Sequence, residues 1–183
     1  PDSISDIPLK KFKKLSYQVD AVNQGYELLL RYNGFFLADV VGTGKTVMAA
    51  LLAKKFIINN GPKTKILIVY PPTLEKNWKS TFKEFRIDEK CHFIANGSLN
   101  KIVEGDHNYS DKERYDLILV DEAHKFRNHR SQQFQNLQII CKAGREHVGG
   151  VEGFDKKVVL ISATPLNNKP EDIYNLITLF QDS

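Results

Sequence analysis

The sequence predicts an α/β fold with a mainly parallel sheet and helices on both faces. Short runs of β-branched and aliphatic residues alternate with stretches of helical period along the chain. Strand, turn and helix follow one another repeatedly, which is typical of sheets whose strands are joined by helical crossovers. No repeat of roughly 20–50 residues is visible, so nothing indicates a repeat architecture.

In the first half of the chain, strands and helices alternate between clear turn signals. Ser16 can cap a helix that Gly34 ends, and a short buried strand over 35–38 follows. Apolar residues at helical spacing predict a helix over 45–58, which Asn60-Gly61-Pro62 stops. The continuous apolar run 66–70 is a strand, after which Thr73 can cap a further helix reaching residue 85.

The second half repeats the alternation and brings the expected strands to at least five. The expected strands are 91–95, 115–120 and 157–161, and the expected helices are 132–141 and 171–180. Segments 105–113 and 144–156 are polar or glycine-rich, and we expect them to be mobile loops.

The amino-acid composition limits the classes of protein to which this chain can belong. The chain has 183 residues, 42% hydrophobic and 26% charged, which suits one packed domain. Its 26 Lys and Arg against 22 Asp and Glu give a net charge of +4, a mild preference for polyanions. Two distant cysteines, Cys91 and Cys141, exclude a disulfide framework or a Cys-based zinc site. Without a signal-peptide core or an apolar run of roughly 20 residues, we expect an intracellular protein with no membrane partner.

The most informative segment is 39–46, between a predicted strand and a predicted helix. Gly42 and Gly44 lack a side chain that would keep a phosphate chain from the backbone N–H groups and the positive end of the helix. Lys45 would reach the β- and γ-phosphates, and the Thr46 hydroxyl would bind Mg²⁺. A glycine-rich turn that only packs a helix on a sheet does not require Lys-Thr at its end. We therefore expect a nucleotide site.

Two carboxylates follow the apolar run 115–120. Asp121 and Glu122 would stand at the carboxyl end of a strand, where such sheets bind ligands. Asp121 would hold magnesium through water, and Glu122 would orient or deprotonate the water that attacks the γ-phosphate. The alternative, an Asp-Glu pair on a solvated turn, does not account for the strand before it. His124 has no neighbours that could complete a zinc site, so we expect it to link the nucleotide site to other segments.

Two hydroxyl side chains, Ser162 and Thr164, follow the predicted strand 157–161, and Pro165 prevents that strand from continuing. Taken alone, this is an ordinary exit from a strand. Together with the two earlier segments, it is expected to be a coupling element.

These three segments together resemble motifs I, II and III of the DEAD/DEAH-type helicase superfamily. Asp39, where the general P-loop has Gly, and the run from Thr164 to Asn168 before a helix make the chain similar to the Swi/Snf-type ATPases over about residues 15–180. The resemblance implies a RecA-like P-loop fold, with residues 1–183 as the first of two lobes and the second lobe absent. It implies ATP and Mg²⁺ as cofactors, with Thr46 and Asp121 at the metal. The implied nucleotide contacts are Gln18, Gly42, Thr43, Gly44, Lys45 and Thr46.

The resemblance also implies a role for residues outside the three motifs. Gln18 would hydrogen-bond the adenine base, and the turn with Pro72 and Thr73 would hold a phosphate of the nucleic-acid backbone. Ser98 is a candidate for the next backbone contact, whereas Trp78 is expected to pack in the core. The lysines at 10, 11, 13 and 14 could touch DNA, but a solvated charged surface is the favoured interpretation.

Three positions depart from the pattern common in the family. Val40, Thr43 and Ala163 stand where many members have Glu, Leu and Gly. These departures favour a bacterial-type branch over the eukaryotic remodellers, and hence a cytoplasmic rather than a nuclear location.

The function implied is that of an ATP-dependent double-stranded-DNA translocase, which hydrolyses ATP to ADP and phosphate when joined to its second lobe. The isolated lobe is expected to be nearly inactive, because an arginine from the second lobe is missing. One alternative is an RNA helicase or a restriction-type translocase lobe. Another is a non-enzymatic module whose binding is gated by nucleotide, against which Asp121 and Glu122 argue. A P-loop kinase or GTPase does not combine Asp121–His124 with Ser162–Thr164.

Overall fold

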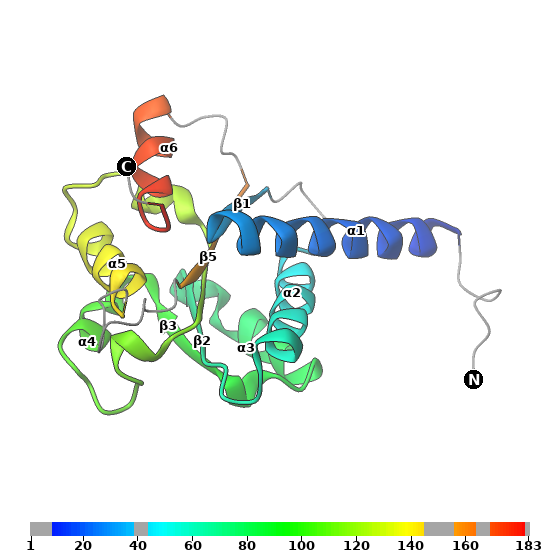
Figure 1. Ribbon diagram of the computed structural model, residues 1–183, viewed down its shortest axis with the longest axis horizontal. Helices are drawn as coiled ribbons and strands as arrows, with labels where there is room; N and C mark the ends of the chain where they lie inside the picture. The colour runs from blue at the N-terminus through cyan, green and yellow to red at the C-terminus, as the bar shows by residue number, and fades with distance from the viewer. Residues whose placement is uncertain (1–8, 39–43, 145–155, 164–168, 182–183) are drawn as a thin grey trace.

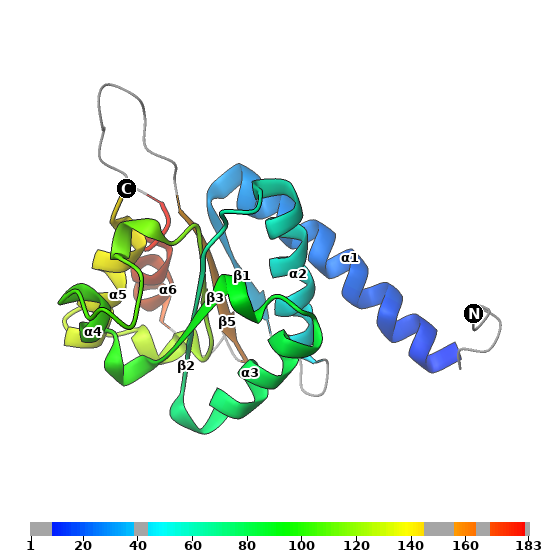
Figure 2. The same cartoon turned by 90° about the horizontal axis from the view of Figure 1, so that it is seen from below.

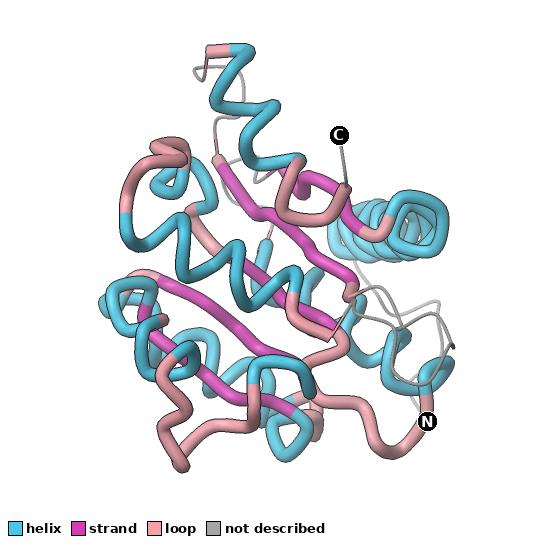
Figure 3. The backbone as a smooth tube through the Cα atoms, turned by 60° about the vertical axis from the view of Figure 1, so that its left-hand side comes forward, coloured by secondary structure: helices cyan, strands magenta, loops and turns pink. Residues whose placement is uncertain are grey.

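The computed structural model describes residues 9–38, 44–144, 156–163 and 169–181. Within these ranges a five-stranded sheet forms the centre in the order β1-β5-β4-β2-β3, and every neighbouring pair is parallel. Figure 3 shows the strands as one layer between helices. The strands are β1 (Gly34–Ala38), β2 (Ile66–Tyr70), β3 (Cys91–Ala95), β4 (Leu117–Val120) and β5 (Lys157–Ser162). The predicted α/β fold is confirmed.

Helices cover both faces of this sheet (Figures 1 and 2). One face carries α1 (Leu9–Tyr32), α2 (Lys45–Asn60) and α3 (Glu75–Glu84). The other carries α4 (Asn100–Val103), α5 (Gln132–Lys142) and α6 (Pro170–Ile177). The first part of α1 extends beyond the sheet in both views. None of the helices in the described ranges combines the length and apolar character that a bilayer crossing needs.

Alternate residues of each central strand contribute to two separate cores. In β2, Ile66, Ile68 and Tyr70 pack with α1, α2 and α3, whereas Leu67 and Val69 pack with the opposite helices. Successive side chains of a strand point to opposite faces, so a strand covered on both sides must be apolar throughout. This explains why the strands could be recognised as continuous apolar runs.

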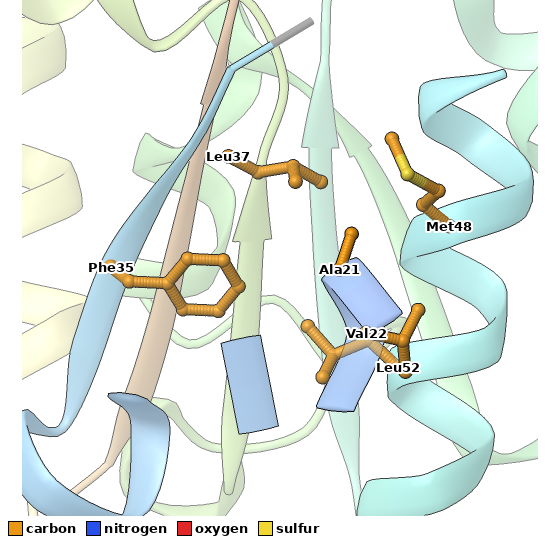
Figure 4. Close-up of a pocket in the computed structure, with 6 residues that line it drawn as sticks. All are labelled: Ala21, Val22, Phe35, Leu37, Met48 and Leu52. Atoms are coloured by element: carbon orange, nitrogen blue, oxygen red, sulfur yellow. The ribbon is translucent and has the colours of Figure 1, made fainter. Parts of the chain in front are cut away.

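A small apolar cavity remains in the first of these cores, between α1, β1 and α2. Figure 4 shows its lining side chains, which are Ala21, Val22, Phe35, Leu37, Met48 and Leu52. Because these residues offer no hydrogen-bonding side chain, the cavity belongs to the packing of the core.

The ends of α1 differ from the prediction. The helix begins at Leu9, so the expectation that Ser16 caps it was wrong, and Ser16 is an exposed residue inside the helix. No Pro or Gly occurs between Leu9 and Gly25, and the intervening lysines are good helix formers. The residue in the left-handed conformation after the helix is Asn33, with φ 66°, and Gly34 already belongs to β1.

The start of α3 also differs. A 3₁₀ turn over Pro72–Leu74 precedes the helix, which begins at Glu75, so Thr73 does not cap it. Two consecutive prolines, Pro71 and Pro72, fix the backbone and remove two N–H donors, which favours a tight turn before the helix.

Several smaller elements complete the comparison. Neither α4 nor the 3₁₀ turn Ala123–Phe126 was expected, and α6 ends at Ile177, before the expected end of its helix. Segment 105–113 is a series of turns held by backbone hydrogen bonds such as Asp106 N to Lys101 O at 2.9 Å. Most of 144–156 lies outside the described residues.

Candidate functional site

The carboxyl ends of the parallel strands share one edge of the sheet, and the predicted motifs meet there. Lys45 begins α2 after β1, Asp121 and Glu122 follow β4, and Ser162 is the last residue of β5. β5 lies between β1 and β4 in the sheet. The strand order therefore places segments that are far apart in sequence next to one another.

Lys45 faces both carboxylates at this edge. Its Nζ lies 2.9 Å from Asp121 Oδ1 and 3.4 Å from Glu122 Oε1. The Asp121 side chain is 0% exposed, whereas those of Lys45 and Glu122 are 17% and 23% exposed. A buried carboxylate is tolerated only when a cation and hydrogen bonds compensate it. Lys45 supplies that charge here, and its position near the surface leaves it accessible to an anionic ligand.

Two further donors fix the orientation of Asp121. The backbone N–H of Glu122 donates to Oδ1 at 2.8 Å, and the indole Nε1 of Trp78 donates to Oδ2 at 2.9 Å. Trp78 is fully buried, as expected, and its ring packs 5.8 Å from that of Phe82. Its contact with Asp121 could not be predicted from the sequence, beyond the general need of a buried indole for an acceptor.

Thr46 lies in the first turn of α2 and is nearly buried. Its hydroxyl oxygen accepts a hydrogen bond from Nδ2 of Asn77 at 3.1 Å. A hydroxyl and a carboxylate are the hard oxygen ligands that Mg²⁺ prefers, and magnesium sites in nucleotide enzymes take their remaining ligands from phosphate and water. The residues at this edge therefore fit a magnesium ion bound together with a nucleotide. Within the described ranges, no group of three or more His, Cys, Asp or Glu forms a metal cage, and such a site needs none.

Glu122 adopts a left-handed conformation, with φ 52° and ψ 44°. This backbone is sparsely populated for a residue with a side chain, and such residues cluster at functional sites. The side chain of Glu122 reaches His124, with Oε2 3.1 Å from Nε2. The strained turn therefore points the carboxylate toward both Lys45 and His124.

His124 joins this carboxylate to the end of β5. Its Nδ1 lies 3.0 Å from Oγ of Ser162. In a neutral ring, Nε2 would donate to Glu122 and Nδ1 would accept from Ser162, since a carboxylate only accepts. The structure thus brings together two of the three expected coupling residues, and Thr164 lies outside the described residues.

Gln18 of α1 approaches the start of α2. It is only 5% exposed, and a Cβ placed on Gly44 would lie 3.3 Å from its Nε2. Gly44 itself has φ 69°, a conformation that favours glycine. Gly42 and Thr43 lie outside the described residues, so their expected contacts with a nucleotide stay predictions.

The candidate nucleic-acid contacts follow β2 and β3, which are neighbours in the sheet. Pro72 and Thr73 are exposed in the 3₁₀ turn after β2, and Ser98 is half-buried in the turn Asn96–Ser98 after β3. The register pairs Tyr70 with Ala95, so both turns leave the same edge of the sheet. Their role in binding nucleic acid stays a prediction.

The parallel sheet and the lysine at a helix start facing an Asp-Glu pair define a helicase-like ATPase lobe of RecA-like fold. The family model described as "Type III restriction enzyme, res subunit" matches residues 11–167, so the chain belongs to this family.

Curated relatives and a solved structure agree with this assignment. The "Uncharacterized ATP-dependent helicase YqhH" of Bacillus subtilis is 30% identical over 94% of this chain and 30% of that protein. The "Chromodomain-helicase-DNA-binding protein 1-like" of Danio rerio is 24% identical over 91% of this chain and 17% of that protein. The structure described as "Sulfolobus solfataricus SWI2/SNF2 ATPase core in complex with dsDNA" has a TM-score of 0.64 and 16% identity, and the match covers 90% of this chain and 35% of that one.

This structural likeness shows the fold, and together with the family and the relatives it confirms the resemblance to the first lobe of Swi/Snf-type helicases. The chain spans less than a third of each of the two curated relatives. The expected cytoplasmic location stays a prediction.

Proposed function

We propose that this chain is the first RecA-like lobe of an ATP-driven double-stranded-DNA translocase, acting with a second lobe of the same polypeptide. The observation that carries the proposal is the cluster of Lys45, Asp121 and Glu122 at the carboxyl edge of the sheet. The family and the helicase names of the relatives support it.

Nucleotide binding follows from an exchange of partners at Lys45. Its ammonium group compensates two carboxylates in the structure. A triphosphate held by the segment 39–46 and the start of α2 would offer this ammonium a stronger anionic partner. Gln18 would hydrogen-bond the base, and its near burial beside Gly44 supports this.

Hydrolysis would be an in-line attack of water on the γ-phosphate, giving ADP and phosphate. Glu122 would orient this water and accept its proton, while Lys45 compensates the charge that grows on the phosphate oxygens. A bound Mg²⁺, held through Thr46 and Asp121, supplies further neutralisation of those oxygens. The ammonium group of Lys45 and the strained backbone of Glu122 keep these groups positioned before the reaction begins.

Movement along DNA requires that ATP binding and hydrolysis change the nucleic-acid contacts and the position of the other lobe. A change in the contacts of Glu122 would be transmitted through His124 and Ser162 to the segment after β5. Pro72, Thr73 and Ser98 would contact the phosphate backbone, so binding should weaken with salt. A second lobe would supply the arginine that completes the catalytic site.

The experiment that tests this function compares ATP hydrolysis by the full-length protein with duplex DNA and with single-stranded RNA. We expect stimulation by duplex DNA and little by RNA. The reverse order would favour an RNA helicase. ATP binding without turnover in either case would favour a nucleotide-gated binding module.

A restriction-type translocase lobe is the second candidate, because the matching family is described by the res subunit of type III restriction enzymes. Such a protein would couple ATP hydrolysis to strand cleavage. The full-length protein incubated with supercoiled plasmid and ATP is expected to leave the DNA uncut. ATP-dependent linear product on a gel would select the restriction-type candidate.

A further inference from the structure

The first turn of α3 contacts both residues that are proposed to hold magnesium. Asn77 Nδ2 donates to Thr46 Oγ1 at 3.1 Å, and Trp78 Nε1 donates to Asp121 Oδ2 at 2.9 Å. The two donors are consecutive in sequence, whereas their acceptors lie on α2 and after β4. One helical turn thus connects the two sides of the proposed metal site.

These contacts do more than pack the helix. Asn77 is exposed, so its amide could be satisfied by water. Trp78 packs on Phe82 through its ring, and a phenylalanine would supply most of that packing. The indole N–H is a donor only, and it is directed at the oxygen of Asp121 that does not contact Lys45. Each donor therefore fixes the orientation of an oxygen ligand.

The same helix continues directly from the exposed turn Pro72–Leu74. The backbone N–H of Glu75 donates to Pro72 O, so turn and helix form one hydrogen-bonded segment. Tyr70, the last residue of β2, donates from its hydroxyl to Glu75 Oε1 at 2.9 Å and anchors the junction. A displacement of the turn by a bound phosphate would therefore move Asn77 and Trp78 with it.

We propose that Asn77 and Trp78 are positioning residues that orient Thr46 and Asp121 for magnesium and link the Pro72–Leu74 turn to that site. The inference rests on the proposed function, since it concerns how nucleic acid affects the ATP site. Donors behind a metal ligand typically change metal affinity or activity about 10–100-fold when they are removed.

The first test measures how much Mg²⁺ is needed for ATP to raise the melting temperature of the 183-residue chain. Trp78→Phe keeps an aromatic ring and removes the N–H, and we expect the half-maximal Mg²⁺ concentration to rise about 10-fold. Phe82→Leu disturbs the same packing without touching Asp121, and we expect its Mg²⁺ requirement to be that of the unmodified chain.

Asn77→Ala provides a second variant, on an exposed residue that can be changed without loss of folding. We expect it too to raise the Mg²⁺ requirement. Its matched control is Ser80→Ala on the same helix, because the Ser80 hydroxyl donates only to the backbone oxygen of Asn77 among the contacts described. An unmodified chain that shows no Mg²⁺-dependent response to ATP would contradict the proposed function itself. A normal response in the unmodified chain, with unchanged requirements in Trp78→Phe and Asn77→Ala, would overturn this inference alone.

The link to the turn is tested in the full-length protein, by the factor with which duplex DNA accelerates ATP hydrolysis. We expect this factor to fall in Trp78→Phe and to stay the same in Phe82→Leu. An equal factor in Trp78→Phe and the unmodified protein would overturn the link.

Discussion

Strand β4 is flanked by two aspartates whose surroundings differ, Asp116 at its amino end and Asp121 at its carboxyl end. Asp116 is 31% exposed and accepts from the backbone N–H of Lys65 at 2.9 Å and from Arg114 at 3.3 Å. Asp121 is fully buried and accepts from the side chains of Lys45 and Trp78. The Asp116 carboxylate holds the backbone at Lys65 in place, whereas the Asp121 carboxylate connects the side chains of Lys45 and Trp78.

Two lysines near opposite edges of the sheet differ in a similar way. At the amino edge, buried Lys156 donates to the backbone oxygens of Lys112 and Ile140. At the carboxyl edge, Lys45 contacts the side chains of Asp121 and Glu122. A contact to backbone atoms holds elements in place, whereas a contact between side chains can be exchanged for a ligand. The two lysines therefore have different uses in one fold.

The largest difference is expected between Asp121→Asn and Asp116→Asn. Asparagine at 121 removes the charge that Lys45 and the proposed metal require, and ATP hydrolysis by the full-length protein should fall by at least about 100-fold. Asparagine at 116 keeps an acceptor for the N–H of Lys65 and loses only an exposed ion pair, at a cost of less than about 1 kcal/mol in unfolding free energy. Turnover assays and denaturant unfolding measure the two effects. Similar losses of turnover in both variants would contradict the distinction between the two ends of β4.

Two glycines with positive φ, one near each edge of the sheet, also differ in their surroundings. Gly44 begins α2 at the carboxyl edge, and Gly61, with φ 109°, ends it at the other. Alanine at either position strains the backbone by about 1–2 kcal/mol or more. Only Gly44→Ala also crowds Gln18, so it should weaken ATP binding several-fold, whereas Gly61→Ala should lower stability alone. Calorimetric titration with ATP distinguishes the two variants. Equal affinities of the two variants for ATP would mean that Gln18 does not contribute to the nucleotide site.

A third difference concerns pH and Lys156. Burial lowers the pKa of this ammonium group to about 8, from an ordinary value of 10.5. Between these values the unfolded chain binds the proton and the folded chain does not, so this residue makes stability rise with pH. Below pH 8 both states are protonated and its contribution is constant.

Lys156→Met should remove this dependence. The unfolding free energy of the unmodified chain, relative to the variant, is expected to increase by about 1 kcal/mol per pH unit from pH 8 to 10. Denaturant unfolding at pH 7, 8, 9 and 10 measures the difference. A constant difference would mean that Lys156 keeps its ordinary pKa in the folded chain.

The positions of the strands and the meeting of the motifs at one edge of the sheet could be predicted from the sequence. A strand covered on both faces must be apolar between its ends, and β4 satisfies this before Asp121, as does β5 between Lys157 and Ser162. Since carboxyl ends of parallel strands share an edge, the meeting of Lys45 with Asp121 could be expected.

Other features depend on tertiary packing and could not be predicted. The contact between Trp78 and Asp121 joins residues 43 positions apart, and it depends on where α3 packs on the sheet. The cap expected at Thr73 failed because the prolines before it form a 3₁₀ turn first. Local signals of capping were thus less reliable than burial, which acts along a whole element.

The function proposed here depends on Lys45 binding the phosphates of ATP. It is tested by the ATP-induced rise in melting temperature, with Mg²⁺ present, in the unmodified chain and in Lys45→Ala. We expect a clear rise in the unmodified chain and none in Lys45→Ala. An equal rise in both would show that the nucleotide binds elsewhere or without this lysine.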